Sequence, residues 1–464
     1  MGGALANMAV SFMGRTPVNL NYTAGQDVLG RCIQKAGITR VITSRRLLEK
    51  TGLKATLEMI YLEDLMAVLP RGQIISERLL FSVLSARAAI RRYGSKARVP
   101  LETTSAILFS SGSTGEPKGV TLSHANILSN ILGLGQVYDL GKKDRILGIL
   151  PFFHSFGFTA TLWFPLVHGF GAVYHTSPLD AKVVGELAQK FKATLLLSTP
   201  TFLSAYTRKC RPEQFYSLRY VITGAERLRE DLAKSFEEKF GKTPMEGYGC
   251  TELSPVAAVN VPDVSMGEIE QVGHKPGKIG HPLPGVSVRI VDPESFAPVP
   301  QGRPGLLLVK GPNVMLGYWK DPEKTQAVMR DGWYVTGDIA TIDSDGFIQI
   351  TDRLSRFSKI GGEMVPHVMI EEKLHILAGR TDPTFVVTAL PDENRGEQLV
   401  VLYAGYEGPI EELWAKLNQS GLPKLWIPAK DRFLAIPTIP YLGTGKLDLV
   451  KVRSIAKELS IARK

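Results

Sequence analysis

The chain has 464 residues, more than one ordinary hydrophobic core supports, so two or three packed units are expected. Hydrophobic residues make up 44% of the chain, and its 45 glycines and 29 prolines follow no repeat, which excludes fibrous and intrinsically disordered proteins. A formal net charge of +10 favours an acidic partner, whether a nucleotide, an anionic membrane surface or an acidic carrier protein.

The start of the chain lacks the basic region and the long apolar core of a secretory signal, so no export is predicted. The cysteines Cys32, Cys210 and Cys250 are few and widely spaced, which indicates neither a disulfide framework nor a zinc site. A reducing, cytoplasmic setting is therefore expected.

Two stretches in the first half of the chain need interpretation. The densest basic stretch is Arg87, Arg91, Arg92, Lys96 and Arg98, and a solvated helix face is favoured over a binding site there. Residues 146–177 contain no Asp, Glu, Lys or Arg, but prolines, histidines and glycines interrupt them. Buried strand and helix pieces of a core are therefore favoured over a membrane span.

Residues 181–240 predict alternating helices and strands. Val184, Leu187 and Phe191 belong to a helical apolar stripe, which is followed by a strand at 194–197. A second strand is predicted at 220–223, and a second amphipathic helix follows it, with apolar residues every four positions from Leu228 to Phe240. This alternation predicts an α/β fold with a mostly parallel sheet covered by helices.

The pattern changes after a strand at 346–350. Short strands are predicted at 385–388 and 399–403, with amphipathic helices near 409–417 and 447–459. We therefore expect a large domain over residues 1–352 and a small, mobile α+β domain over residues 353–464. The turn from Asp352 to Ser355 is the candidate hinge.

The strongest chemical signal is Ser110-Ser-Gly-Ser-Thr-Gly-Glu-Pro-Lys118-Gly, which follows a strand-like Ala106-Ile-Leu-Phe109. Small residues allow successive backbone N–H groups to converge on phosphate oxygens, and Lys118 supplies positive charge. The Gly-Lys-Ser/Thr ending of a Walker A loop is absent. By itself, such a loop is as often a flexible turn as a phosphate site.

Further segments follow in order: Gly224-Ala-Glu226, Glu246-Gly-Tyr-Gly-Cys-Thr-Glu252, Trp333-Tyr-Val-Thr-Gly-Asp338, Asp352-Arg353, Lys359-Ile-Gly-Gly362 and Gly443-Thr-Gly-Lys446. With the phosphate loop, this series resembles the adenylate-forming (AMP-binding) ligases. The resemblance implies ATP and Mg²⁺ as cofactors and the attack of a carboxylate on the α-phosphate, with catalysis by positioning and by neutralising developing charge.

The resemblance also implies individual roles. Tyr248 would stack on adenine, Thr251 would contact the α-phosphate, Glu252 would help to hold Mg²⁺, and Asp338 would accept the ribose hydroxyls beside Arg353. The complete set of implied ATP contacts is Ser110, Ser111, Gly112, Ser113, Thr114, Gly115, Lys118, Gly224, Ala225, Glu226, Glu246, Gly247, Tyr248, Gly249, Thr251, Asp338, Arg353 and Lys446.

Two residues are candidates for catalysis alongside Thr251. Lys446 would bridge the substrate carboxylate and the phosphate, although a lone lysine is more often a surface cation. His154, within Pro-Phe-Phe-His-Ser-Phe-Gly, resembles the family's acyl-site histidine, and a core histidine is an equal alternative. Gly361 and Gly362 would let the arm of an acceptor thiol run close to the backbone. Cys250 is read as a small spacer.

The whole chain is most similar to the acyl-acyl carrier protein synthetase half of bifunctional 2-acylglycerophosphoethanolamine acyltransferases. This similarity implies activation of a long-chain fatty acid and transfer of the acyl group to the thiol of acyl carrier protein, with coenzyme A as the alternative acceptor. No nucleic acid is expected, and the protein is expected to be cytoplasmic, with the option of peripheral contact with the inner membrane. Three departures stand out. Family members have several tens of residues before the point that matches Met1, so truncation is expected, and Ser355 and Glu246 replace usual hinge and adenine-site residues.

Other functions remain open at this point. A long-chain fatty acid-CoA ligase is the first alternative, and an inactive or truncated nucleotide-binding module is the second. A phospholipid acyltransferase would need a His-x₄-Asp pair, and His175 and Asp180 have that spacing. Because the accompanying Pro-Glu-Gly segment is absent, chance explains this spacing better.

Overall fold

The computed structural model describes residues 1–54, 57–94, 99–111, 116–361, 363–380, 382–392, 395–441 and 447–462. The chain forms two compact units, each made of three segments. Unit 1 comprises Met1–Arg289, Leu308–Thr336 and Ile342–Gln349, and unit 2 comprises Ile290–Leu307, Gly337–Thr341 and Ile350–Lys464. The sequence predicted one boundary at 352/353. Strand pairing between distant segments assigns two shorter stretches to unit 2 as well.

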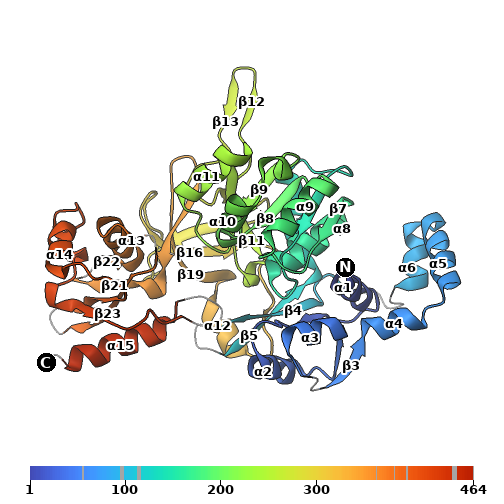
Figure 1. Ribbon diagram of the computed structural model, residues 1–464, viewed down its shortest axis with the longest axis horizontal. Helices are drawn as coiled ribbons and strands as arrows, with labels where there is room; N and C mark the ends of the chain where they lie inside the picture. The colour runs from blue at the N-terminus through green and yellow to red at the C-terminus, as the bar shows by residue number, and fades with distance from the viewer. Residues whose placement is uncertain are drawn as a thin grey trace. The chain divides into compact units, whose positions relative to one another are not determined.

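Unit 1 contains a seven-stranded sheet of order β14-β11-β10-β9-β8-β6-β7 (Figure 1). The five strands from β10 to β7 are parallel neighbours, and β11 and β14 continue the sheet in antiparallel fashion. The strands are β6 (Arg145–Gly148), β7 (Gly171–Tyr174), β8 (Leu195–Ser198), β9 (Tyr220–Thr223), β10 (Pro244–Gly249), β11 (Val256–Val259) and β14 (His281–Pro282). The predicted mostly parallel sheet is confirmed.

Helices connect and cover these strands: α7 (His124–Val137), the π-helix η1 (Phe156–Trp163), α8 (Phe164–His168), α9 (Ala181–Phe191), α10 (Pro200–Lys209), the 3₁₀ helix η2 (Pro212–Phe215) and α11 (Glu230–Phe240). The sequence explains their packing. In α9, for example, Val184 and Ala188 are buried four residues apart, as a helix that packs on one face requires. The predicted helices at 181–191 and 228–240 are confirmed.

The uncharged stretch 146–177 forms β6, η1, α8 and β7, so the prediction of buried core pieces is confirmed. Within the described part of the chain, no helix combines the length and the apolar character that crossing a membrane requires.

A second sheet of unit 1 has the order β1-β4-β5-β17. Its strands are β1 (Val18–Asn19), β4 (Thr104–Ser111), β5 (Pro117–Ser123) and β17 (Gly317–Tyr318). Ser123 caps α7 in a capping box with Asn126, which fixes the direction in which the chain leaves β5. The strand predicted at 106–109 is confirmed within β4.

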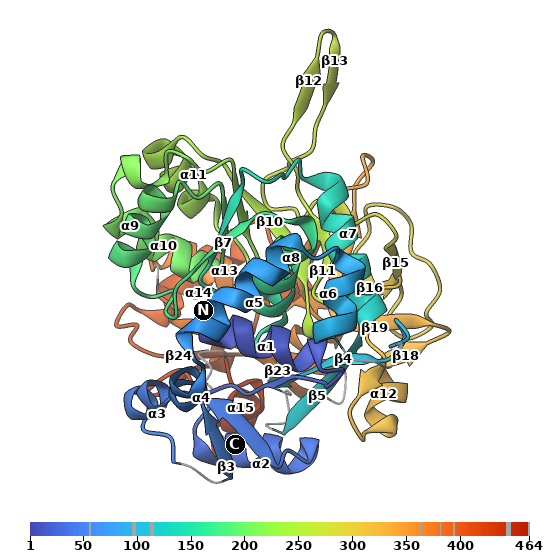
Figure 2. The ribbon, with the colours of Figure 1, turned by 90° about the vertical axis from the view of Figure 1, so that its right-hand side faces the viewer.

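Apart from the 3₁₀ helix η3 (Thr251–Leu253), the remaining elements of unit 1 lie mainly near the amino terminus. They are α1 (Gly2–Phe12), α2 (Gln26–Ala36), β2 (Arg40–Thr43), α3 (Arg45–Thr51), β3 (Glu58–Tyr61), α4 (Leu62–Val68), α5 (Arg71–Val83), α6 (Ala86–Tyr93) and α12 (Pro322–Val328). The hairpin of β12 (Val264–Met266) and β13 (Ile269–Gln271) projects from this unit (Figure 2).

A further five-stranded sheet has the order β15-β16-β19-β18, with β20 paired to β19. Its strands are β15 (Ser287–Val291), β16 (Gly305–Lys310), β18 (Met329–Arg330), β19 (Trp333–Ile342) and β20 (Ile348–Arg353).

Unit 2 contains a sheet of order β22-β21-β24-β23, with β25 paired to β24. Its elements are the 3₁₀ turn η4 (Leu354–Arg356), β21 (Phe357–Ile360), β22 (Glu363–Pro366), α13 (His367–Leu377), β23 (Phe385–Asp392), β24 (Gly396–Tyr403), α14 (Ile410–Asn418), η5 (Lys424–Trp426), η6 (Lys430–Arg432), β25 (Phe433–Ala435) and α15 (Leu449–Ala462). The strands and helices predicted after residue 380 are confirmed.

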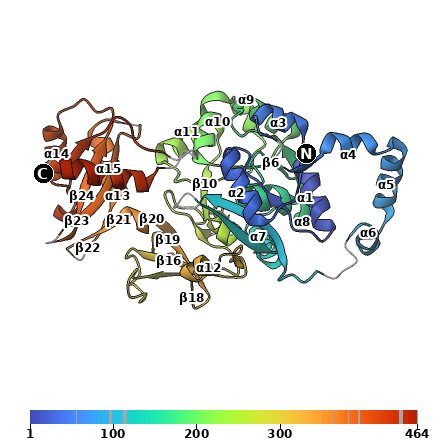
Figure 3. The same cartoon turned by 90° about the horizontal axis from the view of Figure 1, so that it is seen from below.

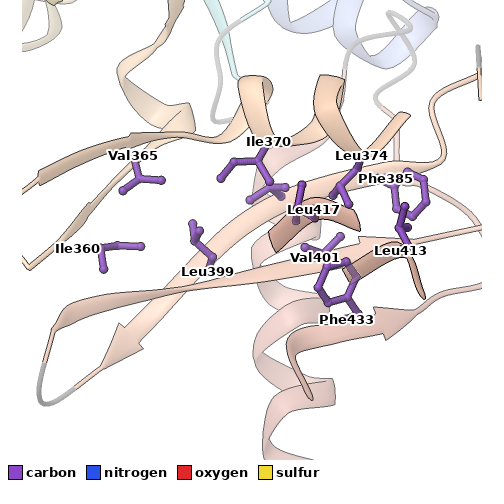
Figure 4. Close-up of a cluster of buried hydrophobic side chains, with 11 residues drawn as sticks. Ile360, Val365, Ile370, Leu374, Phe385, Leu399, Val401, Leu413, Leu417 and Phe433 are labelled. Atoms are coloured by element: carbon purple, nitrogen blue, oxygen red, sulfur yellow. The ribbon is translucent and has the colours of Figure 1, made fainter. Parts of the chain in front are cut away.

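The core of unit 2 lies on both faces of this sheet because side chains alternate along each strand. Phe385 and Val387 of β23 pack in one cluster with Leu374 of α13 and Leu413 of α14 (Figure 4). Val386, between them, packs in the other cluster with side chains of α15.

Candidate functional site

Two predicted nucleotide segments meet at the carboxyl ends of β9 and β10. Thr223, the last residue of β9, pairs with Glu246 of β10. A Cβ atom on Gly224 would lie 3.3 Å from the Gly247 carbonyl oxygen and 3.5 Å from the Phe156 ring. The structure therefore brings the segments 224–226 and 246–249 together with the start of η1. Ligands of parallel α/β sheets typically bind at this strand end.

The loop after β9 has an unusual backbone. Ala225 has φ of +68°, a left-handed conformation that costs a non-glycine residue energy and is frequent at functional sites. Beside it, the Glu226 carboxylate accepts hydrogen bonds from the backbone N–H and the hydroxyl of Thr201, at 3.1 and 2.6 Å. Glu226 thus ties the loop to the start of α10.

The β10 strand also carries irregularities near the predicted adenine contact. Its register with β11 shifts between Tyr248 and Gly249, a bulge of the kind that re-aims side chains next to active sites. A Cβ atom on Gly249 would lie 1.9 Å from the Pro255 carbonyl oxygen, so only glycine fits there. Tyr248 is half-buried.

Glu246 points into the protein. It is buried, and its Oε1 accepts a hydrogen bond of 3.2 Å from the backbone N–H of Leu228. Burial raises the pKa of Glu246, while the backbone donors oppose that shift. In the described residues its carboxylate supports the loop that follows β9.

The flanks of the predicted phosphate loop form a strand pair. Ser110 and Ser111 of β4 pair with Lys118 and Pro117 of β5, so the loop closes one antiparallel hairpin. Gly112, Ser113, Thr114 and Gly115 lie outside the described residues. Lys118 Nζ lies 5.3 Å from the centre of the Tyr318 ring.

Tyr318 links Glu252 to Lys118, and the sequence did not identify this tyrosine as a site residue. Tyr318 donates a hydrogen bond of 2.9 Å from its hydroxyl to Glu252 Oε1, while its ring contacts Lys118. Burial and the Glu252 charge raise the pKa of Tyr318, and Tyr334 is hydrogen-bonded to it. Glu252 itself is buried, so a chain of hydrogen bonds from Tyr334 through Tyr318 fixes its carboxylate.

The sequence held only a weak signal for this cluster. Tyr334 lies in the Trp333–Asp338 segment, but nothing in that segment indicates that its hydrogen-bond partner is Tyr318. Tyr318 is 66 residues from Glu252 and reaches it only because β17 pairs with β5.

The catalytic candidates Thr251 and His154 lie in neighbouring segments. The hydroxyls of Ser155 and Thr251 are 3.3 Å apart, which joins the start of η1 to the turn after β10. His154 precedes Ser155, has an exposed side chain, and stacks at a tilt on Phe153 with ring centres 4.6 Å apart. The alternative of a core histidine is therefore wrong.

An apolar cavity of about 230 Å³ lies at the other end of η1. Side chains of α1, α7, η1 and α8 line it, among them Ile127, Ile131 and Trp163. Two buried donors at this cavity, Ser11 Oγ and Trp163 Nε1, have no hydrogen-bond partner among the described residues. The π-helix thus runs from the Thr251 contact to an apolar space.

Unit 2 holds the second group of predicted residues. Arg353 Nε lies 3.2 Å from Oδ1 of Asp338, whose side chain is only 9% exposed, so the expected proximity of these two residues is confirmed. Gly361 occupies an exposed turn with φ of +58°. Gly362 and Lys446 lie outside the described residues.

A buried polar network lies next to the candidate hinge in unit 2. Arg356 is ion-paired with Glu371, and burial raises the pKa of Glu371 to about 7. Burial likewise raises the pKa of Asp352 to about 6. His367 Nε2 is 2.6 Å from the Ser358 hydroxyl, and burial lowers the pKa of His367 to about 3, so this histidine is neutral.

Other candidates have simpler environments. His175 and Asp180 are paired at 3.0 Å, and the Asp180 side chain is 49% exposed at the start of α9. All three cysteines, Cys32, Cys210 and Cys250, are free. In the described part of the chain, no group of three or more His, Cys, Asp or Glu side chains is arranged to hold a metal ion.

Comparisons with known proteins agree with this arrangement. A family model described as AMP-binding enzyme matches residues 4–319. The long-chain-fatty-acid–CoA ligase of Bacillus subtilis (strain 168) is 34% identical over 75% of this chain and 61% of the ligase. A feruloyl-CoA synthase of Amycolatopsis sp is 32% identical over 76% of this chain and 70% of the synthase. The chain thus spans less than two thirds of the Bacillus ligase.

Solved structures match almost the whole chain. MatB from Rhodopseudomonas palustris with ATP bound superposes with a TM-score of 0.76 and 24% identity over 99% of this chain and 87% of MatB. The o-succinylbenzoate CoA synthetase MenE from Bacillus subtilis, in complex with its acyl-adenylate intermediate, superposes with a TM-score of 0.77. Its sequence is 22% identical, and the match covers 97% of this chain and 86% of MenE. These matches confirm the predicted fold class, a large α/β amino-terminal domain with a small carboxyl-terminal domain.

Proposed function

Because the chain belongs to the AMP-binding enzyme family, we propose that it activates a long-chain fatty acid with ATP and transfers the acyl group to the thiol of coenzyme A. Relatives in Bacillus subtilis and Yersinia pestis that are named long-chain-fatty-acid–CoA ligases support this substrate and acceptor. The observation that carries the proposal is the cluster of Lys118, Tyr318 and Glu252 beside the Thr251 turn.

The chemistry follows from the residue types in this cluster. A carboxylate oxygen of the acid attacks the α-phosphorus of ATP, the bond to the bridging oxygen breaks, and pyrophosphate leaves. The thiol then attacks the acyl carbon and AMP leaves. Lys118 neutralises phosphate charge, and the Thr251 hydroxyl donates to the α-phosphate, so catalysis is mainly positioning. No covalent enzyme intermediate is required.

Glu252 fits a magnesium ion that ATP brings with it. Its Oε1 accepts a hydrogen bond from the Tyr318 hydroxyl, which orients the carboxylate. Magnesium commonly uses one or two carboxylates together with substrate phosphates instead of a cage of protein ligands. Glu252 would therefore hold the ion, which would neutralise charge on the phosphates.

The apolar cavity at the end of η1 is evidence for a substrate with an apolar acyl chain. Its lining is apolar except for a few donors, as is usual for ligand cavities. We propose that the carboxylate lies near His154 and Thr251 and that the chain follows η1 towards Ile127 and Ile131.

Acyl carrier protein is the second candidate acceptor. The net charge of +10 suits an acidic protein surface, and the resemblance to acyl-acyl carrier protein synthetases points to the same acceptor.

The residues of unit 2 keep their proposed roles. Asp338 and Arg353 would bind the ribose, and Lys446 would bridge the substrate carboxylate and the phosphate. Gly361 and Gly362 keep theirs at the thiol arm.

The deciding experiment is exchange of labelled pyrophosphate into ATP by the full chain with Mg²⁺ and one acid at a time. We expect exchange with a long-chain fatty acid, and thioester formation when coenzyme A is added. Exchange with an aryl acid alone would replace the fatty acid with the substrate class of the feruloyl-CoA synthase. Absence of exchange with every acid would favour a nucleotide-binding module. Thioester formed on acyl carrier protein but not on coenzyme A would reverse the order of acceptors.

A further inference from the structure

Helices α4, α5 and α6 carry an unusual number of exposed apolar side chains. In Figures 1 and 3, α4 leads away from β3, and α5 and α6 lie beyond it at the edge of unit 1. On α5 alone, Ile75, Leu79 and Val83 are 60%, 64% and 80% exposed. Apolar side chains so exposed and so close together mark an interaction surface.

The three residues on α5 form one face of that helix because they recur every four positions. The opposite side of α5 makes the contacts with α6, although Phe81 on that side is itself 60% exposed. Glu77 is ion-paired with Arg92 at 2.8 Å, and Phe81 contacts the Tyr93 ring with centres 5.9 Å apart. Glu77 follows Ile75 by two positions, and Phe81 follows Leu79 by two positions. Two positions correspond to about 200° around a helix, so Glu77 and Phe81 lie on the side opposite Ile75 and Leu79. The contact with α6 therefore leaves the Ile75, Leu79 and Val83 face uncovered.

The base of this arm is anchored to the rest of unit 1. Arg45 of α3 makes two hydrogen bonds of 2.7 Å to the Asp64 carboxylate of α4. The neighbouring α4 side chains Met66 and Val68 are 60% and 77% exposed, which extends the apolar surface towards α5.

The charge of the arm selects the kind of partner. Arg78 of α5 and Arg87 and Arg91 of α6 are exposed. Of the acidic residues of the arm, Glu77 is paired with Arg92 and Asp64 with Arg45, which leaves Glu63 of α4. Exposed apolar side chains combined with arginines are characteristic of helices that lie in the interface of an anionic bilayer. In a two-fold symmetric dimer the same surface of each copy would meet, so the arginines of one copy would face those of the other and repel them. An anionic lipid surface is therefore favoured over a second copy of the chain.

We propose that the α4–α6 arm docks unit 1 on an anionic lipid surface, with the Ile75, Leu79 and Val83 face entering the headgroup region and the exposed Arg78, Arg87 and Arg91 contacting lipid phosphates. This inference rests on the proposed function in one respect, because a long-chain fatty acid partitions into membranes and docking would bring the enzyme to its substrate. Arg87, Arg91 and Arg92 are exposed in the structure, as expected for a solvated helix face, and the proposal adds a binding role for part of that face.

The test is co-sedimentation of the full chain with vesicles, without ATP or fatty acid. We expect binding to vesicles with about 30% phosphatidylglycerol, at least tenfold weaker binding to pure phosphatidylcholine, and weakening in about 0.5 M salt. The variant with Ile75→Ser, Leu79→Ser and Val83→Ser should lose at least tenfold in affinity, and Val83→Ser alone should lose part of it.

The matched control is Met266→Ser with Ile269→Ser, because both side chains are 70% exposed on the β12–β13 hairpin of the same unit. It should bind like the wild type. Equal binding of the triple variant and the wild type would overturn the proposal, and so would binding that ignores lipid charge. A wild-type dimer that the triple variant abolishes, without vesicle binding, would instead assign the face to a second copy.

Vesicle binding is independent of catalysis, so its failure is distinguishable from failure of the proposed function. The triple variant should retain pyrophosphate exchange with a water-soluble medium-chain acid.

Discussion

The Tyr318 hydroxyl donates a hydrogen bond of 2.9 Å to Oε1 of Glu252, and both side chains are buried. The contact joins β17 to the turn after β10, and the ring of Tyr318 also faces Lys118. Tyr318 is thus a positioning residue for a carboxylate and a cation that we propose act on ATP and its metal ion.

Tyr318→Phe should lower the rate of pyrophosphate exchange about tenfold, because a hydrogen bond to a charged group is lost while the ring remains. The apparent Mg²⁺ requirement should rise at the same time, since Glu252 would be less well held. Tyr334→Phe is the control, because it removes a hydrogen bond one step further from Glu252 and should have a smaller effect. An unchanged Mg²⁺ dependence in Tyr318→Phe would contradict the positioning role.

Filling the apolar cavity should change chain-length preference. Ile127→Trp places a larger side chain in the cavity, so exchange with a long-chain acid should fall at least tenfold while exchange with a short-chain acid changes little. Leu132→Trp is the matched control, since it makes the same kind of change at an exposed position of the same helix. Equal loss with long and short acids, or equal loss in both variants, would show that the cavity does not hold the acyl chain.

The buried His367 should make unfolding sensitive to acid. Its pKa is about 3 in the folded protein because of burial, against about 6.5 in an unfolded chain. The unfolded state therefore binds more protons in this interval, and stability from this residue is lost as the pH falls from 6.5 towards 3.

Between pH 7.5 and 4.5 the wild type should lose about 3 kcal/mol more free energy of unfolding than His367→Gln, measured in urea. The raised pKa values of Asp352 and Glu371 act in the opposite direction, but both proteins share them. The same pH dependence in the two proteins would mean that His367 is not held neutral.

Two substitutions in the small domain should separate the half-reactions. Lys446→Ala should abolish adenylate formation by at least a hundredfold, because no cation then bridges carboxylate and phosphate, yet it should still transfer the acyl group from supplied acyl-adenylate. Gly362→Leu should keep pyrophosphate exchange and lose thioester formation, because a side chain would block the thiol arm. Circular dichroism checks that both variants fold. Equal impairment of both half-reactions in both variants would refute separate roles.

Most of the helices and strands could be predicted from local sequence patterns. The aliphatic runs at 195–198 and 220–223 became parallel strands, and the periodic helices beside them became α9 and α11. Such elements are predictable because apolar periodicity reports which face is buried. The order of small motifs also sufficed for the family, since Ser110, Gly224, Glu252 and Asp338 each lie in a recognisable segment.

The contacts between those segments were decided by tertiary structure alone. Whether Glu246 faces a ligand or the protein depends on where the backbone N–H of Leu228 lies, and the chain places that donor against its carboxylate. The partner of Glu252 is Tyr318, because β17 joins β5 as a neighbouring strand. Likewise, the exposure of Ile75, Leu79 and Val83 depends on which face of α5 meets α6. Sequence periodicity identifies a face, but only the fold determines what covers it, because burial is a property of distant segments brought into contact.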